Sequence, residues 1–417
     1  MERKWDDASC FLFRDCEEKI VKILVYRWNA YSYTDVIQTF QAMGHIVEEL
    51  EYHLDHYDED PAFFELLQNR LRAGAYDLVF SINYFGVVSD ACESCGVKYA
   101  SWTCDNPLIS MYHASVCNVC NYIFCFDKSN YLEFQAMGCK HIWHLPLAVD
   151  VERIDHVLGQ AEDLPAYENE IAFVGSLYEK NSYDRMKGRL PDYLQGYFEA
   201  VIRAQMDIIG GNIIEDLLQP DILAELEEYY RLEKSERSFA NLGLIFSTTV
   251  LGFQVAKRQR RQVLLQLGKR YEVGIYTNSD TSDLLGVNYR GGVDYWTQMP
   301  KVFHMSKINL NLTIPNIVTG IPLRVWDVLG AGGFLLTNYQ AELPLYLENK
   351  KDLVYFENMR ELEELTAYYL THEEERQAIA AHGRETVKQQ HSYKKRLAEL
   401  LRLVENNESG SCMRTLP

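Results

Sequence analysis

The chain has 417 residues, of which 47% are hydrophobic and 24% are charged, so it is long enough for two or three globular domains. Its 60 acidic residues outnumber 41 basic ones and give a formal charge of -19 at pH 7, which argues against nucleic acid or anionic membrane as the main partner. No apolar run approaches the roughly 20 residues of a transmembrane helix, and the charged start MERKWDDASC is unlike a signal peptide. The composition therefore predicts a cytoplasmic protein with reduced cysteines.

Residues 1–150 alternate short β-branched runs with amphipathic helices. Helix patterns such as TDVIQTFQAMG and PAFFELLQNRLRAG end at glycine, a common helix stop. Strands that alternate with helices predict βαβ units on a parallel sheet, and hence a Rossmann-like domain. The predicted strands are 21–26, 45–50, 77–82, 98–103, 122–127 and 141–146.

The segment 151–169 is polar, contains Pro165 and has no strand pattern, so we expect an interdomain linker. A second α/β pattern over 170–390 predicts another Rossmann-like domain, with a helical insertion over 184–269. Its predicted strands are 170–176, 271–277, 307–313, 333–338 and 352–356.

Residues 391–404 form a last amphipathic helix. Leu397, Leu400, Leu401 and Val404 recur at three- and four-residue steps, so one face must be buried. Since the second domain is complete before this helix, we expect the helix to cross back to the first domain.

Two CxxC pairs, Cys92 with Cys95 and Cys117 with Cys120, have a spacing that can ligate zinc. The alternative is four packed thiols, because free cysteine behaves as a small apolar residue. The pairs fall within βα units and not on the tight turns typical of zinc knuckles. We therefore expect no metal.

Two facing Rossmann-like domains bind ligands at the carboxyl ends of their strands. The run AFVGSLYEKN ends a strand at Gly175 and Ser176, where the backbone can approach a phosphate, and Lys180 follows with a neutralising charge. An ordinary strand-to-loop turn is the alternative.

The segment NLTIPNIVTGIPLRVWDVLGAGGFLLTN is the second candidate. Thr319 and Gly320 precede a helix that Pro322 is suited to begin, and the free amides of a helix N-terminus can bind a diphosphate. Arg324 can add a charged contact, and Asp327 can accept the hydroxyls of a ribose. An Arg–Asp pair on a solvated helix face is the alternative.

Three further residues of the second domain are weaker candidates. Tyr276 ends a strand and can pack against a nucleobase or within the core. Arg260 and Arg261 lie in the helical run AKRQRRQ, where a solvated face is the expected reading and a phosphate contact the alternative.

In the first domain, TCDNP places Asp105 at the carboxyl end of a strand, as a catalytic base or acceptor contact. An Asx turn or helix cap is the alternative. Asn83 and Tyr84 follow another strand end and can line an acceptor site. We expect His113 to be structural.

Taken together, the segments resemble bacterial CgeB-like (spore-maturation-type) glycosyltransferases of the GT-B superfamily. The pieces that carry the resemblance include AFVGSLY, VDYWTQMPKVFHMSKINLNLT, TGIPLRVWDVLGAGGFLLTNYQAELP, and in the first domain VFSINYFGVVSDACESCGVKYASWTCDNPL and YIFCFDKSNYLEFQAMG. The resemblance implies a GT-B fold with an acceptor-side first domain and a donor-binding second domain. It also implies transfer of a sugar from a nucleoside diphosphate sugar, without metal or other cofactor, to a protein or surface glycan.

The resemblance also implies residue roles. Arg324 and Asp327 match the arginine and acidic residue of the donor helix, where the acid holds the ribose, and Lys180 stands one residue closer to Gly175 than the usual diphosphate lysine. Thr319 replaces the first acid of the pair found in many retaining enzymes, so the stereochemistry stays open. A nucleotide-sugar epimerase or hydrolase, or a non-catalytic nucleotide-sugar-binding subunit, is the alternative on the same fold.

Overall fold

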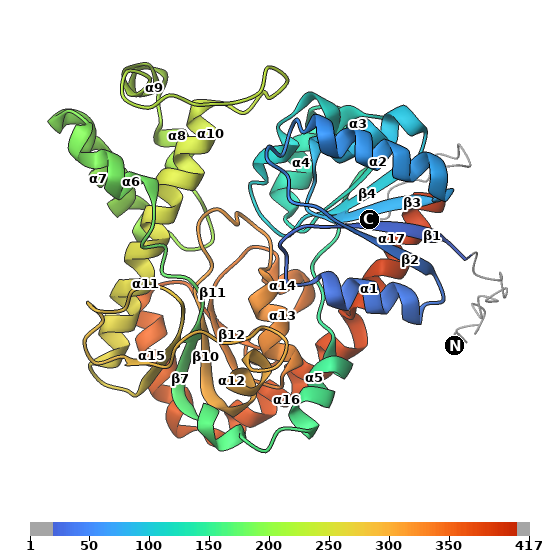
Figure 1. Ribbon diagram of the computed structural model, residues 1–417. Helices are drawn as coiled ribbons and strands as arrows, with labels where there is room; N and C mark the ends of the chain where they lie inside the picture. Colours follow the sequence, from blue (N-terminus) through green and yellow to red (C-terminus); the bar gives the residue numbers. More distant parts are fainter. Residues whose placement is uncertain (1–19, 407–417) are drawn as a thin grey trace, which may run out of the picture.

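The computed structural model describes residues 20–406, which form two α/β domains, each with a six-stranded sheet (Figure 1). Every strand pair in both sheets is parallel. The prediction of two Rossmann-like domains with parallel sheets is therefore confirmed. In this part of the chain, no helix is long and apolar enough to cross a membrane.

The first sheet has the strand order β2-β1-β3-β4-β5-β6, and each predicted strand forms within two residues of its expected position. Its strands are β1 (Lys22–Arg27), β2 (Ile46–Glu51), β3 (Leu78–Ile82), β4 (Lys98–Trp102), β5 (Asn121–Cys125) and β6 (Ile142–His144). The connecting helices are α1 (Tyr33–Ala42), α2 (Pro61–Gly74), α3 (Gly86–Cys95) and α4 (Lys128–Ala136).

Local sequence explains where these helices start and stop. Asp60 caps α2 by accepting the Phe63 amide at 2.9 Å, and Pro61 follows as the first helical residue. Gly96 ends α3 with φ of 65°, a left-handed conformation that costs glycine little. Asp127 caps α4 in the same way as Asp60 caps α2, and it also makes contacts outside its own domain that are described below.

The second sheet has the order β12-β11-β10-β7-β8-β9. Its strands are β7 (Asn169–Val174), β8 (Val273–Tyr276), β9 (Asn288–Tyr289), β10 (Ser306–Asn311), β11 (Leu335–Asn338) and β12 (Val354–Phe356). The sequence did not predict β9, because it is an exposed edge strand of two residues. The helices around this sheet are α12 (Met299–Met305), α13 (Leu323–Gly330), α14 (Leu343–Tyr346), α15 (Met359–Thr371) and α16 (Glu373–Gln390).

The segment 151–169, expected as a linker, connects the two sheets but contains the unpredicted helix α5 (Val151–Gly159). Asp150 caps this helix through the Arg153 amide, and Val151 and Ile154 are buried. The helix packs against α12 of the second domain. The sequence analysis missed this short amphipathic helix because the segment is polar overall and only a few of its residues are buried.

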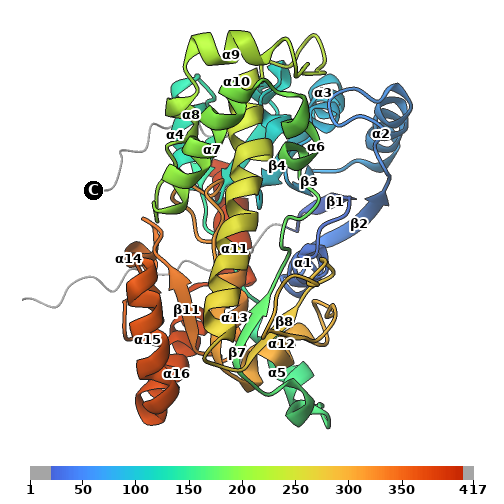
Figure 2. The same cartoon turned by 90° about the vertical axis from the view of Figure 1, so that its left-hand side faces the viewer.

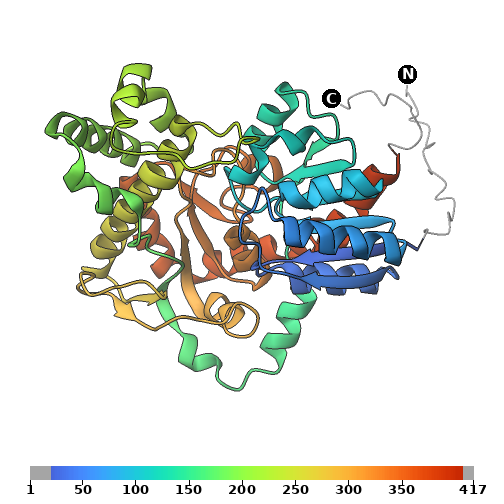
Figure 3. The same ribbon diagram turned by 45° about the horizontal axis from the view of Figure 1, so that its top comes forward.

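A helical insertion separates β7 from β8 (Figure 2). It consists of α6 (Ser182–Met186), α7 (Asp192–Met206), α8 (Ile214–Leu217), α9 (Pro220–Leu226), α10 (Leu242–Ile245) and α11 (Phe253–Gly268). Figure 2 shows α11 running from the other insertion helices down to the second sheet. The insertion also reaches the first domain (Figure 3), where Arg237 pairs with Asp90 at 2.5 Å and its carbonyl accepts the Ala114 amide at 3.0 Å.

The last helix, α17 (Tyr393–Asn406), packs against α1 of the first domain (Figure 1). The ring of Tyr393 lies 6.0 Å from that of Trp102, and Lys98 donates to the carbonyl of Val404 at 3.0 Å. One apolar cluster includes Leu400 of α17, residues of the first sheet and residues of α13. Helix α17 therefore connects the second domain to the first through buried apolar surface.

Candidate donor site at the interdomain cleft

The strand order of the second sheet fixes where a ligand can bind. The chain leaves β7 toward β8 on one side, and β10, on the other side of β7, continues toward β11. Ligands of open parallel sheets bind at such a switch point, beyond the carboxyl ends of the strands. Gly175 and Ser176 follow β7 at this edge, and Leu312 follows β10.

Arg260 of α11 spans this switch point. Its Nη1 donates to the carbonyl of Ser176 at 2.6 Å and its Nη2 to the carbonyl of Leu312 at 2.7 Å. The guanidinium lies over the rings of Phe173 and Tyr178, at 5.5 and 5.0 Å from their centroids. The arginine that the sequence placed on a solvated face is thus half-buried beside the turn after β7.

Within residues 20–406, Arg260 pairs with no carboxylate, and its Nε is buried without a hydrogen-bond partner. Burial lowers the pKa of the Arg260 guanidinium, and the positive charge of Arg324 lowers it further. Arg261, the next residue, is different because it pairs with Asp283 and donates to the carbonyl of Asp280 at 2.9 Å. Arg260 is therefore a cation held in place by backbone oxygens, with its charge left uncompensated.

Arg324 and Asp327 lie one turn apart on α13, as the sequence predicted, at an N–O distance of 4.0 Å. Arg324 lies over the ring of Phe303 at 5.1 Å, and the Tyr295 hydroxyl donates to Asp327 Oδ1 at 2.9 Å. Burial lowers the pKa of the Arg324 guanidinium and raises that of the Asp327 carboxyl. The pair is not on a solvated helix face, since the side chains are only 23% and 8% exposed.

The first domain borders this edge. Tyr31, in the loop after β1, stacks on Tyr295 of the second domain at 5.4 Å and interacts electrostatically with Arg324. Two half-buried cations, Arg260 and Arg324, thus lie close enough for the charge of one to lower the pKa of the other, and Asp327 is the carboxylate beside Arg324. Two neighbouring arginines suit a ligand that carries more than one negative charge.

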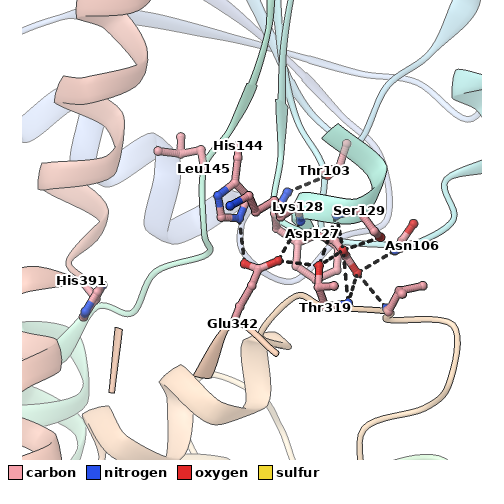
Figure 4. A network of polar contacts seen from close by, with 12 residues as sticks. Thr103, Asn106, Asp127, Lys128, Ser129, His144, Leu145, Thr319, Glu342 and His391 are labelled. Carbon is pink, nitrogen blue, oxygen red and sulfur yellow. Dashed lines mark hydrogen bonds and ion pairs between the residues drawn. The ribbon is translucent and has the colours of Figure 1, made fainter. Parts of the chain in front are cut away.

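The loop before α13 differs from our expectation for Thr319 and Gly320. The amides of Val318 and Thr319 donate to Asp127 of the first domain, at 2.9 and 3.3 Å, and are not free to bind a phosphate (Figure 4). A Cβ on Gly320 would lie 3.0 Å from Asp127 Cα, so glycine permits this close approach. The carboxylate of Asp127 fills the place that we expected a phosphate to take.

Two other donor-side candidates, Lys180 and Tyr276, form no hydrogen bond with Arg260 or Arg324 in the described part of the chain. Lys180 is exposed and forms no hydrogen bond or ion pair with the rest of the described chain. Tyr276 is 4% exposed, and its hydroxyl accepts a hydrogen bond from the side-chain Nδ2 of Asn169, the first residue of β7, at 3.1 Å. Its ring therefore points along the sheet into the core, which is the alternative that the sequence left open.

The structure brings two first-domain candidates together. Asn83 donates to Asp105 Oδ2 at 2.7 Å and accepts the Cys104 amide at 2.9 Å, and Asp105 itself is exposed. Tyr84 is different, because it is fully buried and hydrogen-bonded to Ser115 at 2.7 Å. His113 is buried on the same Ser115 hydroxyl and fits the expected structural role.

The four CxxC cysteines differ in exposure. Cys92 is buried, Cys117 is exposed and lies 3.8 Å from Cys139, and Cys120 contacts the carbonyl of Ser89. Burial raises the pKa of the Cys92 thiol and of the Cys120 thiol. No group of three or more His, Cys, Asp or Glu residues arranged to hold a metal occurs among the described residues.

A family model described as glycosyl transferase-like matches residues 254–402. The match covers less than half of the chain, begins in α11 and ends in α17, and includes Arg260, Arg324 and Asp327. No curated protein sequence matches the chain.

Several solved structures share the arrangement of both domains at low sequence identity. HepE from Anabaena, in complex with UDP and glucose, is 9% identical with a TM-score of 0.54, over 92% of this chain and 99% of that one. Sucrose-phosphate synthase from Thermosynechococcus elongatus is 10% identical with a TM-score of 0.52, over 94% and 100%. A glycosyltransferase from Rickettsia africae is 11% identical with a TM-score of 0.51, over 94% and 100%.

This protein has the GT-B fold. The sequence predicted that fold, but it gave Arg260 only as a weaker candidate beside Arg261 and did not single out Asp127 or Glu342. Arg260 could not be told from Arg261 without knowing which side of α11 faces the sheet. Asp127 carried a usable signal, because FCFDKSN places it between a strand and a helix, but Glu342, its partner across the cleft, carried none.

Proposed function

We propose that this protein is a glycosyltransferase that moves a sugar from a nucleoside diphosphate sugar to an acceptor. The observation that carries the proposal is Arg260, an uncompensated cation bound across the switch point to the carbonyls of Ser176 and Leu312, with Arg324 nearby. The glycosyl transferase-like match covers both arginines. HepE, which has the same fold, is in complex with UDP, so UDP is the first nucleotide to test.

In the proposed reaction, the bond between the anomeric carbon and the diphosphate oxygen breaks, and negative charge grows on the leaving diphosphate. Arg260 and Arg324 would stabilise that charge, and a fixed donor of this kind typically contributes on the order of 10²- to 10³-fold in rate. Both are half-buried, where solvent screens an anion less than in bulk water. Their partners hold them in place before the substrate arrives, which reduces the cost of reorganisation.

Asp327 would hold the ribose, since Tyr295 occupies only one of its two carboxylate oxygens. Lys180 would reach the diphosphate from the exposed loop after β7. Asp105 lies just after β4 and is oriented by a hydrogen bond from Asn83. It would contact the acceptor, or take the proton of the acceptor as the new glycosidic bond forms.

The finer assignments of the proposal are a CgeB-like bacterial enzyme, acting in the cytoplasm on a protein or surface-glycan acceptor. The resemblance of TGIPLRVWDVLGAGGFLLTNYQAELP supports the subtype. Two arginines at the donor edge support metal-independent transfer without a further cofactor, because they supply the positive charge that the leaving diphosphate needs.

A thermal-shift screen of nucleoside diphosphate sugars tests donor binding. A ligand at 100 times its dissociation constant adds about 2.7 kcal/mol of stability, which is readily measured. Mass-spectrometric detection of released nucleoside diphosphate, with and without candidate glycan and peptide acceptors, then tests turnover. Stabilisation by no nucleotide sugar would refute the proposed function, and binding without turnover would indicate a binding subunit.

A further inference from the structure

Two carboxylates connect the domains reciprocally beside the donor helix (Figure 4). Asp127, at the end of β5 in the first domain, accepts from the amides of Val318 and Thr319 in the second. Glu342, in the second domain, accepts the Lys128 amide of the first at 2.7 Å, and its other oxygen lies 2.8 Å from His144 Nε2. Both carboxylates are almost completely buried, with exposed fractions of 0% and 1%.

Thr319 is the residue that both carboxylates share. Its hydroxyl lies 2.7 Å from Asp127 Oδ1 and 2.7 Å from Glu342 Oε1, and it also accepts the Ser129 amide at 3.2 Å. A buried carboxylate that loses such donors is left without solvation, so each contact depends on the others. The network is therefore formed when the domains are docked and is broken when they separate.

The same loop leads directly into the donor helix. Thr319 is followed by Gly320 and Pro322, and α13 then begins at Leu323 and presents Arg324 within its first turn. Asp127 also has a structural role within the first domain. It caps α4 by accepting the Ser129 amide, and it accepts a hydrogen bond from Asn106 Nδ2 at 2.7 Å. One side chain thus fixes the start of α4 and the approach to α13.

We propose that Asp127 is a positioning residue of the donor site, which orders the 317–322 loop and orients Arg324 only when the two domains are closed. The inference rests on the proposed function, because it assigns Arg324 to the diphosphate. Docking of the first domain and completion of the donor site are then a single event. Because Asp127 acts through Thr319, it contacts no part of the nucleotide itself.

The test uses the full-length protein with Asp127→Asn, which keeps the size of the side chain but presents an NH2 group to donors. Asp60→Asn is the matched control, because Asp60 is also a buried helix-capping carboxylate of the first domain but bonds only within that domain. Hydrogen–deuterium exchange reports on the 317–322 loop and α13, titration calorimetry gives the affinity for UDP, and small-angle scattering gives domain separation. All assays are run well below the melting temperature of each variant.

We expect Asp127→Asn to accelerate exchange of the Val318 and Thr319 amides at least tenfold, weaken UDP binding at least tenfold and increase the radius of gyration. Asp60→Asn should lower the melting temperature but change none of these readouts. The Asp127→Asn/Thr319→Val double variant should bind UDP no worse than the weaker single variant, because both substitutions break one network.

A folded Asp127→Asn variant with wild-type loop exchange, or with wild-type UDP affinity while Arg324→Met has lost it, would overturn the inference. If Arg324→Met also binds UDP normally, or the wild type binds no nucleotide, the proposed function fails. The exchange and scattering measurements still decide in that case whether Asp127 orders the loop, because neither measurement needs a ligand.

Discussion

Replacement of Arg260 by methionine separates nucleotide binding from folding. The substitution removes the charge but keeps an unbranched apolar chain over the rings of Phe173 and Tyr178. In the free protein, loss of the hydrogen bonds to Ser176 and Leu312 costs about 1 kcal/mol each. Relief of the buried charge and of its repulsion by Arg324 offsets that cost. We therefore expect the free energy of unfolding to change by no more than about 1–2 kcal/mol.

The effect on the bound state is larger. A hydrogen bond between charged groups is worth about 1.5–3 kcal/mol, and a loss of about 2 kcal/mol weakens binding roughly 30-fold. At a UDP concentration of 100 times the wild-type dissociation constant, the stabilisation then falls from about 2.7 to about 0.9 kcal/mol. Titration calorimetry and urea unfolding with and without UDP measure the two quantities.

Arg261→Met provides the control for this experiment. Arg261 is the neighbouring residue of the same helix, but its charge is compensated by the exposed Asp283. The pair is partly exposed, with exposed side-chain fractions of 13% for Arg261 and 58% for Asp283, so we expect a modest stability loss and wild-type UDP affinity. Equal UDP affinity in Arg260→Met and wild type, or equal losses in the two variants, would refute the assignment of Arg260 to the diphosphate.

The other predictions concern the donor helix, the hinge and the cysteines. Arg324→Ala should weaken nucleotide binding at least tenfold in titration calorimetry without unfolding the protein, and an unchanged affinity would contradict the assignment. Burial lowers the pKa of His391 to about 4, whereas an unfolded histidine titrates near 6.5, so the neutral ring contributes stability above pH 6.5 that is lost toward pH 4. We expect urea unfolding to show a loss of about 2–3 kcal/mol between pH 7.5 and 4.5 from this group, and a correspondingly flatter profile for His391→Asn. Leu400→Ala in α17 should cost about 2–5 kcal/mol, because the side chain is fully buried, and a melting temperature equal to wild type would show that the helix is dispensable. Elemental analysis of protein purified without added metal should find no zinc, and one zinc per chain would show that the cysteine spacing was misread.

The sequence predicts best what depends on local pattern. Strands such as KILVY and DLVFSI are β-branched runs bounded by helix patterns, and their alternation defines two parallel sheets without any knowledge of contacts. The placement of Arg324 and Asp327 on one helix was predicted for the same reason, since that helix and its Pro322 start are visible in one stretch of chain. The helix α5 was missed because its burial depends on α12, which is more than a hundred residues away.

Residues whose role depends on both domains carry no such pattern. Thr319 looked like part of a phosphate cradle because its amide precedes a helix, and no local feature shows that the carboxylate of Asp127, just after β5, already accepts the amides of Val318 and Thr319. The occupation of these amides by Asp127 also limits where an anion can bind without separating the domains. An anion that binds free amides would compete with Asp127 and open the domains, whereas an anion that binds Arg260 and Arg324 leaves the interdomain network intact. In the proposed function, a donor bound to Arg260 and Arg324 would therefore leave the domains closed, which is the condition for transfer to an acceptor in preference to water.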